Sequence, residues 1–243
     1  MSDEIAATRL AWHSGFMLSD RILFIDGEAI VIDKPAGLPV DRPRDGSVSV
    51  EDMRESLHFG FARAPLAVHR LDRDTSGCLL LARNPKAHKR FAAMFEAGLV
   101  EKTYLAVLEG VPVEPAGRIM IPLAKRSTRE EGWRMVPDAK GKPAVTIWEM
   151  LGEVEGRALI LFRPETGRTH QLRVHALHGI GHAIAGDSVY GDGVSPMLLH
   201  ALNLTVPRDG KAAIVAQAVP PATFDPWRAL LPAAASEPED AAA

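Results

Sequence analysis

The sequence predicts an α+β fold in which helices pack on a mixed, largely antiparallel sheet. Short apolar runs separated by turn residues recur along most of the chain, helical patterns are few, and the regular strand–helix alternation of a parallel α/β protein is missing. The chain has 243 residues, of which 47% are hydrophobic and 24% charged, an ordinary balance for a globular protein.

The chain begins with a predicted hairpin. Apolar runs at 22–25 and 29–32 flank Asp26-Gly27, a dipeptide typical of tight turns. Two prolines and a glycine make residues 34–39 a rigid loop. Residues 49–61 then carry apolar side chains at helical spacing, which predicts a helix.

The middle of the chain alternates strands with one strong helix. Strands are expected at 66–71 and 78–82, on either side of a polar turn at 72–77. A helix is expected over 85–97, because a proline opens it and Gly98 follows its end.

The second half is mostly strands. The run at 103–108 is apolar on both faces, as in a central strand. A helix is expected to start near Thr169, with Thr166 or Thr169 as its cap, and to break at Gly179. Further strands are expected at 117–123, 144–152, 157–163, 198–206 and 212–218.

We expect one main domain over residues 21–227. An irregular N-terminal arm covers residues 1–20. The composition of residues 228–243, rich in Ala, Pro and Glu, predicts a disordered tail.

Composition excludes several classes of protein. A single cysteine rules out a disulfide framework and a cysteine-rich zinc site. The sequence shows no apolar run of about 18 residues and no secretory signal, so we expect a cytoplasmic protein without a membrane partner. The net charge is −3, yet residues 60–175 hold 19 Lys/Arg and 13 Asp/Glu. That basic stretch could attract phosphates, although charge alone favours a solvated, salt-bridged surface.

The segment His69–Gly77 is the first candidate for chemistry, with two aspartates and two arginines close together. Neighbouring cations keep a carboxylate such as Asp72 ionised, and an ionised, fixed carboxylate can act as a nucleophile or a base. The alternative is a polar turn neutralised by its own arginines.

Two further segments carry polar groups in structured surroundings. Tyr104, within the apolar stretch 101–107, is a base, an aromatic platform for a nucleobase, or a core residue. Residues 166–175 place many donors at a loop-to-helix junction, where Arg168 and free N–H groups suit an anion. The alternative there is a capped amphipathic helix.

The histidines of this region do not match a metal-ligand spacing, and we expect no metal site: His170, His175, His178 and His182.

Together these segments resemble the RluA-type pseudouridine synthases. The match includes the Lys-Pro-Ala-Gly loop after Asp33, the His69–Gly77 motif, the Tyr104 strand and the 166–175 motif. It ends with Gly-Asp-Ser-Val-Tyr-Gly at 186–191 and Leu-His-Ala at 199–201. The motifs occur in order over most of the chain.

The resemblance implies the pseudouridine synthase fold with a central cleft, no cofactor and no metal. It implies isomerisation of uridine to pseudouridine in an rRNA or tRNA stem-loop, by a compact member that lacks an S4 domain. By position, Asp72 would be the catalytic aspartate, Tyr104 would pack under the target base or act as a base, and Arg173 would pair with Asp72. Arg70 would help to hold the target nucleotide flipped out of the RNA.

Other polar residues are expected to contact RNA. Residues 125–142, rich in charge, glycine and proline, form a candidate RNA-gripping loop. The expected contacts are Arg168, His170, Gln171, Lys86, Lys89 and Arg90, the last three equally consistent with a solvated helix face. Two alternatives remain open: an inactive RNA-binding protein on the same fold, and a hydrolase that uses the Asp or His cluster. A monomer is the default.

Overall fold

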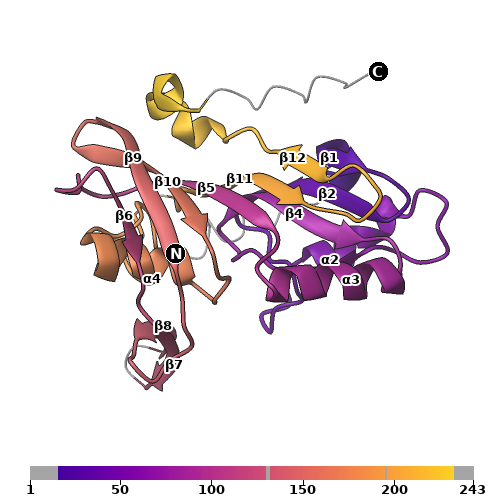
Figure 1. Ribbon diagram of the computed structural model, residues 1–243, viewed down its shortest axis with the longest axis horizontal. Helices are drawn as coiled ribbons and strands as arrows, with labels where there is room; N and C mark the ends of the chain where they lie inside the picture. The colour runs from indigo at the N-terminus through magenta and orange to yellow at the C-terminus, as the bar shows by residue number, and fades with distance from the viewer. Residues whose placement is uncertain (1–15, 130–131, 195, 233–243) are drawn as a thin grey trace.

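The computed structural model describes residues 16–129, 132–194 and 196–232. Its main sheet has ten strands: β1 (Ile22–Ile25), β2 (Ala29–Lys34), β3 (Leu66–Ala67), β4 (Ser76–Ala82), β5 (Glu101–Val107), β6 (Ala116–Ile119), β9 (Thr146–Val154), β10 (Arg157–Pro164), β11 (Leu199–Val206) and β12 (Ile214–Gln217). The strand order is β1-β2-β4-β11-β5-β10-β9-β6, with β3 beside β4 and β12 beside β11 (Figure 1). Among the described strands, β4 and β11 form the one parallel pair. The predicted α+β class and mixed sheet are therefore confirmed.

The predicted N-terminal hairpin is β1 and β2, and its turn is fixed by Asp26. The Asp26 carboxylate accepts the N–H groups of Glu28 and Ala29 at 2.8 and 2.9 Å. The described end of the expected irregular arm is instead a 3₁₀ turn, η1 (Leu18–Arg21). Leu18 is fully buried beside β2, and this burial orders the segment. Residues 1–15 of the arm lie outside the described part.

The helix expected over 49–61 is much shorter than predicted. It is a single α-turn, α2 (Val50–Met53), followed by the 3₁₀ turn η2 (Arg54–Leu57). Ser49 starts it with a capping box. Phe59 and Gly60 both adopt positive φ, and this stops the helix.

The strand expected over 66–71 is likewise short, because the chain leaves the sheet after β3 to build the polar loop before β4.

The helix α3 (Pro85–Glu96) agrees with the prediction. Asn84 caps it by accepting the Ala87 N–H at 2.8 Å, and Gly98 follows its end with φ of 71°. Phe91 and Ala87 bury its apolar face against β2 and β4.

A second small sheet was not predicted. The chain leaves the main sheet after β6 and forms an antiparallel hairpin of β7 (Leu123–Thr128) and β8 (Gly132–Pro137). This hairpin covers much of the segment expected as a loop, and Figure 1 shows it projecting away from the main sheet.

The helix expected near Thr169 begins later and is capped differently. It comprises α4 (Gln171–His175), extended by the π-helical turn η3 (Ala176–Ile180) and ended by Gly181 rather than Gly179. The N-cap is His170, in a left-handed conformation with φ of 52°. Thr166 does not cap the helix, because its hydroxyl binds the Gln171 side chain and the Val145 N–H.

The C-terminal part of the described chain covers the sheet. After β12, the 3₁₀ helix η4 (Ala222–Leu230) buries Phe224 and Trp227 against β5 and β10. The predicted tail boundary at residue 228 is therefore wrong, since residues 228–230 belong to η4, and residues 233–243 lie outside the described part. No helix in the described ranges has the length and apolarity needed to cross a membrane.

Candidate active site

A cleft of about 640 Å³ opens between the C-terminal end of α3 and the N-terminal end of α4. Tyr104 of β5 and Leu199 of β11 also line it. The cleft brings together seven of the predicted site residues: Arg70, Asp72, Tyr104, Arg168, His170, Gln171 and Arg173.

Lys34, at the end of β2, clamps the turn that carries Asp72. Its side chain is fully buried, and Nζ donates to the carbonyl oxygens of Pro35, Leu38 and Arg73 at 2.9, 2.7 and 3.0 Å. Burial lowers the pKa of Lys34 to about 7, although the negative charges of three nearby aspartates raise it. The Lys-Pro-Ala-Gly motif includes Lys34 but does not by itself predict this role.

His69 fixes the other end of the same loop. Its Nε2 accepts the Leu80 N–H at 3.0 Å, and its ring stacks on Phe95 with centroids 4.4 Å apart. Burial lowers the pKa of His69 to about 3, so the ring is a neutral hydrogen-bond acceptor at neutral pH.

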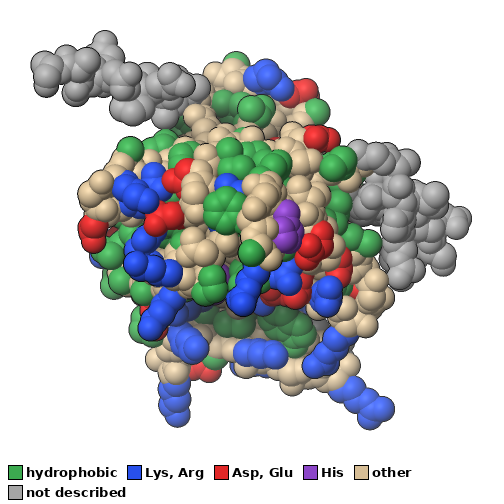
Figure 2. Space-filling view, turned by 90° about the vertical axis from the view of Figure 1, so that its right-hand side faces the viewer, with side chains coloured by type: hydrophobic (Ala, Val, Ile, Leu, Met, Phe, Trp, Pro, Cys, Tyr) green, Lys and Arg blue, Asp and Glu red, His purple; other side chains and the backbone are tan. Residues whose placement is uncertain are grey.

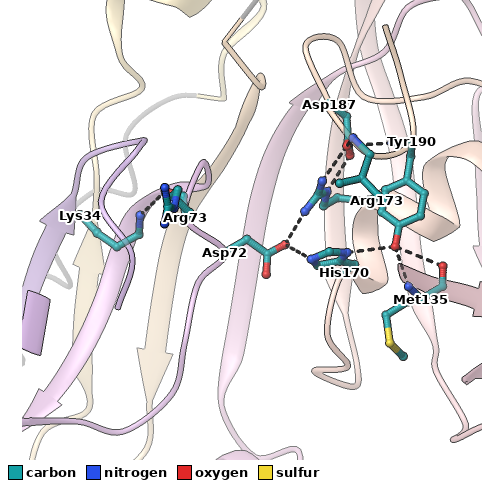
Figure 3. A network of polar contacts seen from close by, with 9 residues as sticks. Lys34, Asp72, Arg73, Met135, His170, Arg173, Asp187 and Tyr190 are labelled. Atoms are coloured by element: carbon teal, nitrogen blue, oxygen red, sulfur yellow. Dashed lines mark hydrogen bonds and ion pairs between the residues drawn. The ribbon is translucent and has the colours of Figure 1, made fainter. Parts of the chain in front are cut away.

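Arg173 joins two carboxylates at the cleft, as Figure 3 shows. Nη1 lies 3.2 Å from Asp72 Oδ2, and Nε and Nη2 donate to the two oxygens of Asp187 at 2.6 Å each. Burial alone would lower the pKa of Arg173, but its bonds to Asp187 and the charges of both carboxylates raise it. The predicted pairing of Arg173 with Asp72 is therefore present in the structure.

Asp187 is the main partner that sequence reasoning missed. Burial would raise its pKa, but the hydrogen bonds from Arg173 lower it, so the carboxyl is ionised. Oδ1 also accepts the N–H groups of Val189 and Tyr190 at 2.8 and 3.0 Å. The Gly-Asp-Ser-Val-Tyr-Gly segment at 186–191 contributes to the family resemblance, but the sequence does not predict that Asp187 binds Arg173.

His170 and Arg173 face the same oxygen of the Asp72 carboxylate. Its Nε2 is 3.8 Å from Asp72 Oδ2, and its Nδ1 is 2.9 Å from the Tyr190 hydroxyl (Figure 3). Burial lowers the pKa of His170 more than the Asp72 charge raises it. The Asp72 Oδ1 atom contacts no polar partner among the described residues, so one carboxylate oxygen is free to meet a ligand.

Tyr104 lines the cleft and is partly exposed. Its strand, β5, pairs with β10 and β11, and Tyr104 lies opposite Phe162 and Ala201 in the two pairings. Burial, followed by the charges of Cys78 and Asp72, raises the pKa of its hydroxyl. The phenol is therefore neutral near pH 7, which favours the platform role over the role of a base.

Two predicted RNA contacts lie at the mouth of the cleft with exposed side chains. Arg70 forms an ion pair with Asp41, 3.1 Å between Nη1 and Oδ2, in which both side chains are more than half exposed. Arg168 Nε donates to the Pro143 carbonyl at 3.0 Å. Exposed pairs of this kind contribute little to stability, so both guanidinium groups can exchange their partners for phosphates.

Gln171, a predicted RNA contact, lines the cleft with its amide bonded within the protein. Its amide oxygen accepts from the Thr166 hydroxyl and the Arg168 N–H, and its amide nitrogen donates to Val145 O and Thr146 Oγ1. These four bonds use the hydrogen-bonding capacity of the amide, so Gln171 braces the wall of the cleft.

The lysines and arginine expected on the helix at 85–97 do not line the cleft. Lys86, Lys89 and Arg90 are exposed on α3, and Arg90 pairs with Glu28 at 2.8 Å.

Among the described residues, no group of three or more His, Cys, Asp or Glu could hold a metal ion. His175 is a buried structural residue bonded to Thr146 and Ile121.

The fold and the cleft agree with what the comparisons show. The model of the RNA pseudouridylate synthase family matches residues 28–178, more than half of the chain. The protein therefore belongs to the RNA pseudouridylate synthases, isomerases that convert uridine to pseudouridine in RNA. The resemblance to the RluA-type synthases is confirmed.

Individual relatives support this placement. A Zymomonas mobilis protein, named as an uncharacterised RNA pseudouridine synthase, is 57% identical over 86% of this chain and 97% of its own length. The ribosomal large subunit pseudouridine synthase D of the same organism is 38% identical over 70% of this chain, which spans 55% of that protein. Among solved structures, human RNA pseudouridylate synthase domain containing 4 has a TM-score of 0.73 at 27% identity, covering 91% of this chain and 95% of that one.

Proposed function

We propose that the protein converts specific uridines of structured ribosomal or transfer RNA to pseudouridine, with Asp72 as the catalytic aspartate. The observation that carries this proposal is the Asp72 carboxylate held by Arg173 in a cleft that Tyr104 also lines. A carboxylate fixed in advance by a buried guanidinium needs little reorganisation when charge develops during the reaction.

The chemistry is an isomerisation at one nucleotide. The N1–C1′ bond breaks, the base turns, and a C5–C1′ bond forms; the C5 hydrogen leaves as a proton and N1 gains one. Asp72 acts at the ribose through the oxygen that Arg173 and His170 leave free. Tyr104 packs under the base while it turns.

The target uridine must leave its stack to enter the cleft. Extraction costs a few kcal/mol in a duplex and less in a loop, which favours stem-loop substrates. Arg70 stands exposed at the cleft mouth and helps to hold the nucleotide flipped out.

Basic side chains next to the cleft provide the grip on the RNA backbone. The described residues of the β7–β8 hairpin include Lys125, Arg126, Arg129 and Arg134. Figure 2 shows Lys and Arg side chains gathered along the lower part of the molecule, the end to which the hairpin projects in Figure 1. Relatives named as large-subunit rRNA synthases make ribosomal RNA the first substrate to test, followed by tRNA.

Release of tritium from RNA labelled at uridine C5 tests this function, because the reaction removes the C5 hydrogen. Unmodified rRNA and tRNA are assayed separately, and release from either pool supports the proposal. If a folded protein that binds both RNAs releases tritium from neither, the alternative of an inactive RNA-binding protein is favoured.

A further inference from the structure

The β7–β8 hairpin contacts the core of the site at two points. Trp133 of β8 stacks on His170, with centroids 5.0 Å apart and an angle of 28° between the rings. Two residues further on, the Met135 N–H donates to the Tyr190 hydroxyl at 2.9 Å, and the same hydroxyl lies 3.1 Å from the Met135 carbonyl oxygen. His170 is thus held by the hairpin on one side and lies against Asp72 on the other.

The Tyr190 hydroxyl joins the hairpin to His170. The Tyr190 hydroxyl has one hydrogen and two acceptor positions. Its oxygen accepts the Met135 N–H, and it lies within hydrogen-bond distance of both the Met135 carbonyl oxygen and His170 Nδ1. Through this bond the hairpin holds Nδ1, while Nε2 is the nitrogen that faces Asp72.

The backbone of His170 agrees with a ring that is held in place. A φ of 52° is unusual for a residue other than glycine and costs about 1 kcal/mol or more. Such a conformation persists where neighbouring contacts fix it. The stack on Trp133 and the bond to Tyr190 are contacts of that kind.

We propose that Trp133 and His170 are positioning residues, through which the β7–β8 hairpin sets the Asp72 carboxylate for reaction. This inference rests on the proposed function and adds a second role for the hairpin besides gripping RNA. Trp133 is 47% exposed, so RNA on the hairpin can contact the residue that orients His170. Contact between RNA and hairpin is then linked to the geometry of Asp72.

The test separates positioning from simple binding by kinetics on an RNA that the wild-type protein converts. Trp133→Ala is expected to lower kcat about tenfold or more with a smaller change in KM, and Trp133→Phe to restore most of kcat because it keeps the stack. Arg126→Ala, on the paired strand with an exposed side chain, is the comparison and should act mainly on KM. A Trp133→Ala variant altered in KM alone would overturn the proposal.

A double-variant cycle tests whether Trp133 acts through His170. Once His170→Ala is present, adding Trp133→Ala should lower kcat no further, whereas independent residues would give additive losses that contradict the proposal.

Ring NMR of His170 provides a readout without turnover. Both Trp133→Ala and Tyr190→Phe should shift the His170 ring signals seen in the wild-type protein. Unchanged signals in both variants would refute the positioning. Failure of the proposed function itself would appear separately, as a wild-type protein that converts no RNA.

Discussion

Arg173 binds Asp187 more closely than it binds Asp72. Both contacts with Asp187 are 2.6 Å long and the Asp187 side chain is fully buried, whereas the contact with Asp72 is 3.2 Å and the Asp72 side chain is 23% exposed. Asp187 therefore anchors the guanidinium, and Arg173 presents its remaining nitrogen to the carboxylate of the cleft. The paired fork geometry explains why lysine could not replace Arg173.

Removing the anchor should damage both stability and activity. Asp187→Ala leaves a buried guanidinium without its main partner, and we expect a loss of about 3–5 kcal/mol in the free energy of unfolding. Chemical denaturation measures that loss. Asp187→Asn keeps the size of the side chain and should lose activity with a smaller loss of stability. Wild-type stability in Asp187→Ala would contradict the anchoring role.

Gly77 should not tolerate a side chain. It has φ of 105°, and a Cβ added there would lie 2.2 Å from the Ala201 carbonyl oxygen, where β4 meets β11. We expect Gly77→Ala to lower the free energy of unfolding by about 2 kcal/mol or more. Gly27→Ala is the control, since a Cβ at Gly27 meets nothing within 4 Å. Equal stability of the two variants would count against this close approach.

The buried ammonium of Lys34 should make stability depend on pH. Its pKa falls from 10.5 to about 7 on folding, so between these values the unfolded chain binds more protons at this site. The contribution of Lys34 to stability therefore rises with pH across this range, by at most about 1.4 kcal/mol per pH unit, and is constant below it. Denaturation of wild type and Lys34→Met from pH 6 to about 10 should show the difference growing in favour of wild type. A constant difference would mean that Lys34 keeps an ordinary pKa in the fold.

RNA affinity should depend on Arg168 more than on Lys89. Arg168 lines the cleft with an exposed guanidinium, whereas Lys89 lies on α3 outside the cleft. Arg168→Ala should reduce the slope of log affinity against log salt by about one, and Lys89→Ala should change it less. Binding titrations at several salt concentrations measure both slopes. A larger effect of Lys89→Ala would move the RNA path onto α3.

Local signals explain the parts of the fold that could be predicted. The hairpin around Asp26 and the helix α3 depend on a turn residue, a cap and a terminating glycine, each readable within a few positions. The hairpin β7–β8 escaped prediction because Leu123 is the one buried residue among its strand residues, so little apolar alternation marks the strands. The early end of the helix expected over 49–61 depends on a positive φ at Phe59, which the sequence pattern does not predict.

The candidate site shows the same contrast between residues that local motifs predict and contacts that they do not. Asp72, Tyr104 and Arg173 were predicted from ordered motifs, and the structure brings all three to one cleft. The anchoring by Asp187 and the brace by Gln171 depend on contacts between segments distant in sequence, which spacing cannot supply. The role of Asp72 in the reaction stays a prediction.

The central claim is that Asp72 performs the chemistry, and single-turnover tritium release from C5-labelled RNA tests it most directly. Wild type, Asp72→Asn and Asp74→Asn are compared at saturating protein, since Asp74 lies in the same loop but does not line the cleft. We predict that Asp72→Asn binds RNA like wild type and releases tritium at least about a thousandfold more slowly, while Asp74→Asn retains most of the rate. Release by Asp72→Asn at the wild-type rate would contradict the assignment.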